Sequence, residues 1–412
     1  MNGWRVRKLG DICEFKPSKR QARAALSDDD PVSFVPMNDL SIGQKYFEAS
    51  EERPFSDVAG SYTYFADGDV LLAKITPCFE NGKLGVARGL VNGIGFGSSE
   101  FTVIRPGREL VAEYLYYFLD RDEVRERGAN AMTGAVGHKR VPQEFVEALE
   151  IPLPPLEEQR RLVAVLDEAF AAIATAMVNA EKNLANAREL FALGVPRIMA
   201  IASAGARAGT LGRIAGRVFT GPFGSLLHKR DYVAAGIPLV NPSHIDNGRI
   251  VPSDDKCVSS ETAERLSSYR MKVGDIVFGR RGEMGRCAVV TESERGFLCG
   301  TGSFFIRPLQ GTDPHYLAHL LRSEPYRKKI EALASGATMP NLSNSALADL
   351  LVALPDYAAQ QVAVSHINAL DAEIARVVSL AERKIAQFGA LKQSLLCRAV
   401  SGKPIGRQLL AA

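Results

Sequence analysis

The 412-residue sequence lacks the features that mark a secreted, membrane-spanning or disulfide-stapled protein. Its six cysteines are scattered and form no CxxC pair, so reduced thiols are expected, and a zinc site or a disulfide framework is not. The amino terminus is polar and basic, and no uninterrupted apolar run approaches about 18 residues, the length of a membrane span. The sequence therefore predicts a cytoplasmic protein without a membrane segment.

Charge of either sign is not in excess. The formal net charge is only +3, with 24% charged and 46% hydrophobic residues, which is ordinary for a globular protein. A balance this weak permits binding to nucleic acid but requires that any basic surface be local. The length allows two or three domains, each large enough to bury its own core.

Motifs that carry chemistry are missing as well. The sequence has no Gly-x-x-x-x-Gly-Lys-Ser/Thr phosphate loop and no Asn/Asp-Pro-Pro-Tyr/Phe motif, with which an amino-methyltransferase grips a flipped base. The glycines of Gly93–Gly97 favour a strand and turn over a nucleotide loop, because no clear helix follows them. His315 and His319 have a spacing that can bind a metal, but the acidic residue of a His-Glu-x-x-His site is absent. We therefore predict no catalytic residue, no metal site and no cofactor in this chain.

What the sequence does contain is an internal repeat at an offset of about 200 residues, far longer than the roughly 20 to 50 residues of a solenoid unit. Gly68–Lys74 (GDVLLAK) recurs as Gly274–Arg280 (GDIVFGR), and Phe101–Pro106 recurs as Ser303–Pro308. The repeat indicates two copies of one globular domain, each followed by a long helix. The expected boundaries are 1–153 for the first domain, 154–207 for the first helix and its linker, 208–354 for the second domain, and 355–412 for the second helix and the tail.

Each copy has the pattern of an α+β domain, because short apolar runs between glycine and proline turn signals are typical of strands. The expected strands lie at Val70–Ala73, Leu84–Ala87 and Phe101–Ile104, and at Ile276–Phe278, Cys287–Val290 and Ser303–Ile306. One short helix per copy is expected, at Leu110–Leu119 and at Pro314–Leu321. In the second, Asp313 would be the N-cap of a helix that begins with proline.

The two long helices are each expected to span roughly 40 residues, or about 60 Å. The first begins after Pro154-Pro155 and the second near Asp356. Gly402 ends the second, whereas Gly194 and Pro196 either end or kink the first.

Apolar residues recur along both helices at alternating steps of three and four, which is the pattern of a coiled coil. The second stripe passes through Val377 and the polar Lys384. We expect the helices to pair antiparallel; the alternative is that each packs on its own domain. The side chains expected in the contact are Leu166, Phe170, Ile173, Met177, Leu184, Ile367, Leu370, Ile374, Phe388 and Leu391.

Five further stretches match the wording of one known family. They are Leu153–Arg160 (LPPLEEQR), Thr220–Ser225 (TGPFGS), Gly236–Val240 (GIPLV), Gly274–Gly282 (GDIVFGRRG) and Leu391–Leu396 (LKQSLL). In this order, on a twofold repeat, they resemble the DNA-specificity subunit of type I restriction–modification systems. There are two departures: Leu354–Gln361 (LPDYAAQQ) lacks the usual Glu before Gln, and Lys74 stands where the second copy has Arg280.

The resemblance implies two target-recognition domains separated by two long antiparallel coiled-coil helices with pseudo-twofold symmetry. It also implies a non-catalytic subunit that recognises an asymmetric bipartite site in double-stranded DNA, one half per domain. Its partners would be two adenine-N6 methyltransferase subunits and ATP-dependent restriction (motor–nuclease) subunits. S-adenosylmethionine, ATP and Mg²⁺ would be bound by those partners. The alternative is the recognition part of a restriction–methylation enzyme with its own activity.

DNA binding requires side chains that neutralise phosphates and side chains that reach base edges. Basic clusters occur at corresponding places of the two copies, beside glycines that allow close approach of the backbone to phosphate. The residues expected to contact DNA are Lys19, Arg20, Lys74, His138, Lys139, Arg140, Ser225, Lys229, Arg230, Arg280, Arg281 and Asn341. Arg280 and Arg281 are the preferred pair, and which residues read bases is left open.

A coiled-coil adaptor without a nucleic-acid role is a further alternative, but it would need neither two such domains nor their basic clusters. Because most loop residues differ between the copies, two different half-sites are expected. The helices would set the gap between them.

Overall fold

The computed structural model describes residues 4–135, 137–222, 226–282, 285–334 and 341–403. The chain forms two compact units: unit 1 holds residues 1–182 and 381–412, and unit 2 holds residues 183–380. Each long helix is therefore shared, with one part in unit 1 and the other in unit 2.

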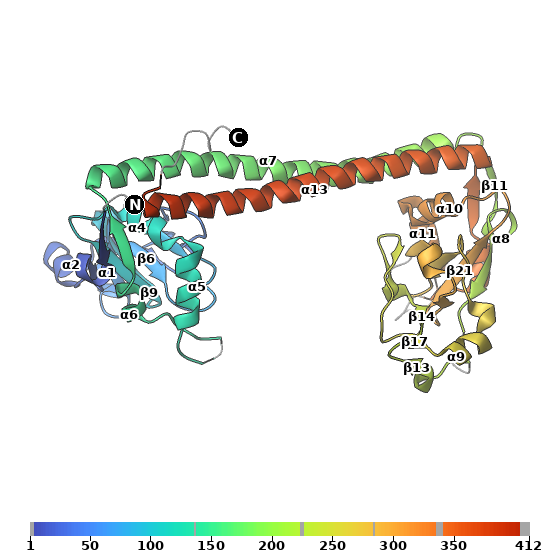
Figure 1. Ribbon diagram of the computed structural model, residues 1–412, viewed down its shortest axis with the longest axis horizontal. Coiled ribbons are helices and arrows are strands. Elements are labelled where there is room, and N and C mark those ends of the chain that lie inside the picture. Colours follow the sequence, from blue (N-terminus) through green and yellow to red (C-terminus); the bar gives the residue numbers. More distant parts are fainter. Residues whose placement is uncertain (1–3, 136, 223–225, 283–284, 335–340, 404–412) are drawn as a thin grey trace. The chain divides into compact units, whose positions relative to one another are not determined.

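The described part of unit 1 contains two four-stranded sheets and a two-stranded ribbon (Figure 1). Across the first sheet the strands are β2 (Cys13–Phe15), β9 (Phe101–Pro106), β6 (Val70–Ala73) and β7 (Leu84–Val86). Across the second they are β4 (Glu51–Pro54), β3 (Pro31–Val35), β8 (Ile94–Gly97) and β5 (Thr63–Ala66). The ribbon pairs β1 (Arg5–Lys8) with β10 (Glu150–Leu153). The helical segments are α1 (Leu9–Ile12), α2 (Arg20–Ala25), α3 (Phe55–Val58), η1 (Val91–Gly93), α4 (Ala112–Leu119), α5 (Asp122–Ala131) and α6 (Gln143–Glu147).

Unit 2 repeats this plan. Its first sheet has the order β12 (Gly216–Thr220), β21 (Ser303–Pro308), β18 (Ile276–Gly279) and β19 (Cys287–Val289). Its second has the order β13 (Tyr232–Val233), β17 (Cys257–Val258), β14 (Ile237–Val240) and β20 (Leu298–Cys299). Two-stranded pairs are β11 (Arg207–Thr210) with β22 (Leu351–Leu354), and β15 (Ile245–Asp246) with β16 (Arg249–Ile250). The helical segments are α8 (Leu211–Ile214), η2 (Lys229–Asp231), η3 (Pro242–His244), α9 (Ser260–Arg265), η4 (Ser267–Tyr269), η5 (Glu292–Glu294), α10 (Pro314–Arg322), α11 (Glu324–Leu333) and α12 (Asn344–Ala348).

The repeat inferred from the sequence is confirmed in the topology. β9 lies between β2 and β6 and runs antiparallel to both, and β21 has the same relation to β12 and β18. In the second sheet of each unit one parallel pair occurs, β3 with β8 and β14 with β20. The expected strands and short helices are present with ends shifted by one or two residues, and Asp313 caps α10 as expected.

The central strands are continuously apolar because both of their faces are buried. Val70 and Leu72 face the core that includes the long helices, whereas Leu71 and Ala73 face the core between the two sheets. Ile276 and Val277 divide in the same way between two cores of unit 2. This two-residue alternation explains why the repeated strand motif has no polar position.

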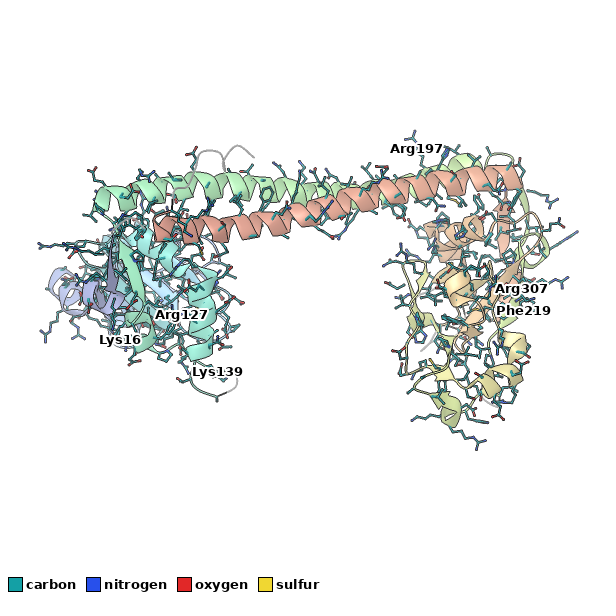
Figure 2. The ribbon with its side chains drawn as sticks, in the orientation of Figure 1. Lys16, Arg127, Lys139, Arg197, Phe219 and Arg307 are labelled. Carbon is teal, nitrogen blue, oxygen red and sulfur yellow. The ribbon has the colours of Figure 1, made fainter. Side chains whose placement is uncertain are left out.

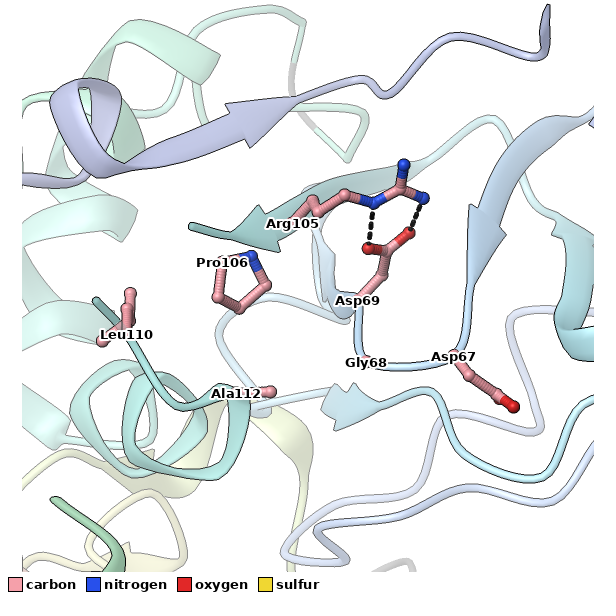
Figure 3. Close-up of a pocket in the computed structure, with 7 residues that line it drawn as sticks. All are labelled: Asp67, Gly68, Asp69, Arg105, Pro106, Leu110 and Ala112. Atoms are coloured by element: carbon pink, nitrogen blue, oxygen red, sulfur yellow. Dashed lines mark hydrogen bonds and ion pairs between the residues drawn. The ribbon is translucent and has the colours of Figure 1, made fainter. Parts of the chain in front are cut away.

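In each unit the aspartate directly before the central strand is buried and forms an ion pair with an arginine of the neighbouring strand. Arg105 on β9 donates from Nε and Nη2 to Asp69 at 2.7 and 2.8 Å (Figure 3). Arg307 on β21 donates in the same manner to Asp275 at 2.9 and 2.7 Å. The hydrogen bond to the Asp carboxylate is the main reason that the pKa of its arginine is raised in both units. The preceding residue in unit 2, Gly274, has a φ of 86°, which favours glycine.

A buried glutamine near the start of each long helix ties that helix to its globular domain. Gln159 accepts from the Val111 N–H at 2.8 Å and donates to the carbonyls of Glu109 and Pro154, both at 2.8 Å. Gln360 accepts from the Asp313 N–H at 2.8 Å and donates to the carbonyls of Gly311 and Pro355 at 3.1 and 2.9 Å. The glutamine is thus the residue of the helix-start motif that binds the helix to its domain. Gln360 makes the same kinds of contacts as Gln159, although the usual Glu before it is missing.

The long helices are α7 (Leu156–Ala202) and α13 (Tyr357–Ser401), and both exceed the expected length. α7 continues through Pro196, so this proline does not end the helix. The turn that follows packs in the unit 2 core through Met199. At Gly194 an added Cβ would lie 2.6 Å from Leu370 Cδ2, so glycine permits a close approach of α7 to α13. The closeness of the two helices at this point gives Gly194 a packing role instead of a stop signal.

The helices contact each other and their globular domains, so the two expected arrangements coexist. In unit 1, Leu166 and Ile173 of α7 share one core with Leu395 of α13, and Phe170, Met177, Phe388 and Leu391 pack against it. In unit 2, Ile367 is buried in a core that also receives Val195 and Met199 of α7. Because the first part of α7 meets the last part of α13, the pairing is antiparallel within each unit. Leu184, Leu370 and Ile374 are half-buried.

The expected stripe on α13 is wrong at two positions. Val377 is 42% exposed and Lys384 is exposed, whereas Val378 and Ile385 are half-buried. From Ile374 the stripe takes a step of four residues where the prediction took three. Both steps occur in a heptad, so apolar neighbours at adjacent positions make the register ambiguous in sequence alone.

By length and composition alone, α7 is also apolar enough to cross a membrane, whereas no membrane segment was expected from the sequence. A single helix of this kind is weak evidence for a span, because a helix that packs in a protein core has a similar composition. α7 contributes Leu162, Leu166 and Ile173 to the core of unit 1.

Candidate nucleic-acid interface

In unit 1 three strand ends meet at one edge of the first sheet. β2 and β6 run in the same direction beside β9, so Lys16 and Lys74, which follow them, lie at the end where β9 begins. Residues 133–135 and 137–141 complete this edge, because Arg140 forms backbone bridges with Thr133 and Ile75. We call Lys16, Lys74, His138, Lys139 and Arg140 the unit 1 edge.

The side chains of the unit 1 edge are organised around one carboxylate, that of Glu100. Arg140 donates to it from Nε and Nη2 at 2.9 and 2.7 Å, and from Nη1 to the His138 carbonyl at 3.2 Å. The hydrogen bond from Arg140 is the main reason that the pKa of Glu100 is lowered, so the carboxylate stays ionised. Burial lowers the pKa of Lys74, and Lys16 and Arg140 add to this effect. The Glu100 carboxylate opposes this lowering of the Lys74 pKa.

Exposure of this edge suits contact with a large anion. His138, Lys139 and Arg140 are exposed, and Figure 2 shows Lys16 and Lys139 on the side of the globular domain away from α7 and α13. Lys74 donates to the Ser99 carbonyl at 2.8 Å, so its ammonium has a partner in the protein. Lys16 has a φ of 51°, an uncommon backbone conformation for a residue with a side chain.

Unit 2 places Arg280, Arg281 and Asn341 at the corresponding edge, after β18. Arg280 was the preferred DNA contact, but it is only 8% exposed. It donates from Nε to Asn341 Oδ1 at 3.1 Å, and its guanidinium carbon lies 5.2 Å from the centre of the Phe304 ring. Burial, and then the neighbouring charge of Arg281, lower its pKa. Arg281 is exposed and forms a backbone bridge with Asn341.

The backbone frame is the same at both edges. The Lys74 N–H donates to the Glu100 carbonyl at 3.0 Å, and the Arg280 N–H donates to the Gly302 carbonyl at 3.1 Å. The carbonyls of Lys74 and Arg280 accept from the N–H groups of Val141 and Leu342, at 2.9 and 3.1 Å. Lys74 therefore corresponds to Arg280, and Arg140 to Asn341. Their backbone positions match, while their side chains have different partners.

Four other residues expected to contact DNA belong to other elements of the described chain. Lys19 donates to the carbonyls of Ala59 and Gly60 at 2.8 and 3.2 Å, so its ammonium holds α2 against the end of α3. Arg20 is exposed on α2. Lys229 and Arg230 are exposed in η2, which leads into β13 of the second sheet. Ser225 lies outside the described residues.

Sequence reasoning missed Glu100, the residue around which the unit 1 edge is built. Its signal was its place directly before the repeated strand Phe101–Pro106, where the second copy has Gly302. Lys16, which follows β2 directly, was not among the expected DNA contacts.

No group of three or more His, Cys, Asp or Glu residues in the described part of the chain could hold a metal ion. A depression of about 230 Å³ in unit 1 is lined by Asp67, Asp69 and Arg105, but the last two are committed to each other (Figure 3). Burial, together with Arg322 and His315, lowers the pKa of His319 to about 4, which keeps this histidine neutral near pH 7.

The two units differ beside the last strand of the first sheet, which is β7 in unit 1 and β19 in unit 2. In unit 1 the neighbouring segment contacts a long helix. In unit 1, Lys45 contacts Asp167 of α7 at 2.6 Å, and Tyr46 donates to Glu113 at 2.8 Å. Unit 2 instead has a groove of about 1110 Å³ between β15–β16, α10–α11 and the helix pair. It is lined by Val195, Met199, Arg249, Arg322 and Asn368 among others. The two copies thus share a frame but not this contact.

The first sheet of each unit has the same backbone frame at its edge but carries different side chains there, and both units include parts of the paired helices. This repetition defines a modular recognition protein. The family model described as "Type I restriction modification DNA specificity domain" matches residues 1–184 and 224–380, so the chain belongs to this family.

Several relatives agree with this assignment. The EcoAI and EcoEI type I restriction enzyme specificity subunits of Escherichia coli are 40% and 38% identical over 164 and 167 residues. Those matches cover 39% and 40% of this chain and 27% of each relative. The MjaVIII specificity subunit of Methanocaldococcus jannaschii is 19% identical over 97% of this chain and 92% of its own length.

Solved structures show the same fold. A chain in a type I R-M system structure has a TM-score of 0.73 at 19% identity, covering 97% of this chain and 98% of that chain. The HsdS subunit from Thermoanaerobacter tengcongensis has a TM-score of 0.63 at 18% identity, with 98% of each chain covered. The expected fold class is therefore confirmed: two α+β recognition domains joined through a coiled-coil helix pair.

Proposed function

We propose that this chain is the non-catalytic DNA specificity subunit of a type I restriction–modification complex. Each globular domain binds one half of an asymmetric bipartite site in double-stranded DNA. The chain directs adenine-N6 methyltransferase subunits, and ATP-dependent restriction subunits, to that site.

The observation that carries the proposal is the pair of matched edges. A common backbone frame places Lys74 and Arg140 in unit 1, and Arg280 and Asn341 in unit 2, at the same two positions. A protein that binds two copies of one ligand would be expected to keep the same side chains there. Different polar side chains on one frame instead suit two different sequences of one kind of polymer. The basic residues beside them suit its phosphates.

The exposed faces of the long helices support binding of partner proteins. On α7, Leu190, Leu193 and Ile201 of unit 2 are 61, 64 and 70% exposed, and Val178 of unit 1 is 61% exposed. Apolar side chains gathered along a helix in this way are typical of protein-binding surfaces. We assign this face to the methyltransferase subunits, of which two would bind.

The same proposal places the chemistry in the partners. S-adenosylmethionine, ATP and Mg²⁺ would be bound there and not by this chain. It also places the protein in the cytoplasm, where chromosomal DNA of a bacterial or archaeal cell is accessible. The lengths of α7 and α13 would set the number of base pairs between the half-sites.

The experiment that tests the proposal compares the single-molecule methylome of the host with and without this gene. We expect loss of N6-methyladenine at one gapped, asymmetric motif, and its return when the gene is restored. An unchanged methylome, together with no sequence-selective DNA binding by the complex with its methyltransferase partner, would contradict it. Methylation of a palindromic site would contradict the assignment of different half-sites to the two units.

A further inference from the structure

The contacts at the two edges point to the residues that read bases. Resting on the proposed function, we infer that Arg140 reads a guanine in the half-site of unit 1. Asn341 reads an adenine in the half-site of unit 2. Glu100 and Arg280 are positioning residues that hold these two side chains.

The donors of Arg140 can be counted. A guanidinium has five N–H donors: one on Nε and two on each terminal nitrogen. Glu100 takes one from Nε and one from Nη2, and the His138 carbonyl takes one from Nη1. One donor therefore remains on each terminal nitrogen. Donors on the two terminal nitrogens are the groups with which arginine binds the adjacent O6 and N7 acceptors of guanine in the major groove.

Glu100 fixes the plane of this guanidinium before DNA binds. The two hydrogen bonds of 2.9 and 2.7 Å form a side-on fork, and after the bond to the His138 carbonyl one donor on each terminal nitrogen is left for a ligand. The Arg140 side chain is 46% exposed and that of Glu100 22%. A bare phosphate contact would not need such orientation, because a point charge such as Lys139 beside it serves equally well.

The hydrogen-bonding groups of the Asn341 side chain match those of adenine. Its Oδ1 accepts one hydrogen bond from Arg280 Nε, and an amide oxygen can accept two. Among the described residues, no hydrogen bond uses its Nδ2. One acceptor and the amide donors are thus left, and adenine presents the matching N6 donor and N7 acceptor.

Arg280 removes an ambiguity that an amide otherwise has. Oxygen and nitrogen of Asn341 are nearly equal in shape, and only hydrogen bonds decide which one lies on which side. Since Arg280 can only donate, it holds the oxygen on its own side. Arg280 is itself held, being 8% exposed and close to the Phe304 ring. It acts on the base through Asn341.

The test uses the chain in complex with its methyltransferase subunits and a library of DNA sites, with methylated sequences as the readout. Arg140→Lys keeps the charge and removes the fork. We expect preference for guanine at one position of one half-site to fall roughly 5- to 140-fold (about 1–3 kcal/mol at 1.4 kcal/mol per tenfold). Glu100→Gln should relax the same position, and adding it to Arg140→Lys should have little further effect.

The matching variants in unit 2 are Asn341→Ala and Arg280→Lys. Both should relax a single adenine position, located in the other half-site. Lys139→Gln and Arg281→Gln are the controls, since loss of a phosphate contact should weaken all sequences alike and lower the salt dependence by about one phosphate. In every variant the untouched half-site reports that the protein is folded.

The outcomes separate the two proposals. If Arg140→Lys or Asn341→Ala weakens all sequences uniformly and relaxes no position, these side chains do not read bases, and the inference is wrong while the proposed function stands. Relaxation at a position that is not guanine for Arg140, or not adenine for Asn341, also overturns it. A wild-type complex that shows no sequence preference contradicts the proposed function itself.

Discussion

Replacing Gln159 by alanine is expected to loosen the attachment of α7 to the first globular domain. Gln159 is fully buried and makes three hydrogen bonds of 2.8 Å, to the Val111 N–H and to the carbonyls of Glu109 and Pro154. Each bond contributes about 0.5–1.5 kcal/mol net, and a buried group left unpaired costs about 1–3 kcal/mol. We expect a loss of about 3 kcal/mol of local stability, or roughly a hundredfold faster hydrogen exchange.

The assay is hydrogen exchange of the full chain followed by mass spectrometry. The Val111 amide reports on Gln159, and the Asp313 amide, which donates to Gln360 at 2.8 Å, reports on a parallel Gln360→Ala variant. Gln361→Ala is the matched control, because Gln361 is exposed and next in sequence. Each variant should affect its own unit. If neither buried glutamine changes exchange more than Gln361→Ala does, the glutamines do not anchor the helices and the reasoning is refuted.

Three further predictions concern unit 2 and the helices. Arg307→Ala leaves the Asp275 carboxylate, whose side chain is 2% exposed, without its cation, and should cost about 2–4 kcal/mol in urea unfolding. The exposed pair of Arg295 is the control, since Arg295→Ala should have little effect on the free energy of unfolding. Burial lowers the pKa of His319 from 6.5 to about 4, so unit 2 should lose up to about 3 kcal/mol as the pH falls through that window, and His319→Gln should flatten the profile. A pH-independent difference between the two proteins would contradict this. Seven residues inserted into both α7 and α13 add about 10 Å and should lengthen the methylated motif's spacer by about three base pairs with unchanged half-sites; a changed half-site would argue against helices as the spacer.

The short strands of unit 2 and its groove could not be predicted from local sequence patterns. The strands of β13, β15, β16, β17 and β20 have only two residues each, too short to produce an alternating pattern. The segment beside β7 is held to α7 by the Lys45–Asp167 contact, and unit 2 has a groove there. Such contacts join residues more than a hundred positions apart, and the local sequence of either segment does not indicate which residue it contacts.

The sequence by itself determined the repeat, the central strands, the paired helices and the family. These depend on periodicity and on local signals, such as the apolar run Val70–Ala73 and the N-cap Asp313, which act over a few residues. Only the tertiary structure decided that Arg280 is buried, that Glu100 organises Arg140, and that α7 continues through Pro196. Burial and hydrogen bonding at these positions depend on which distant strands meet at an edge, and strand order is a property of the folded chain.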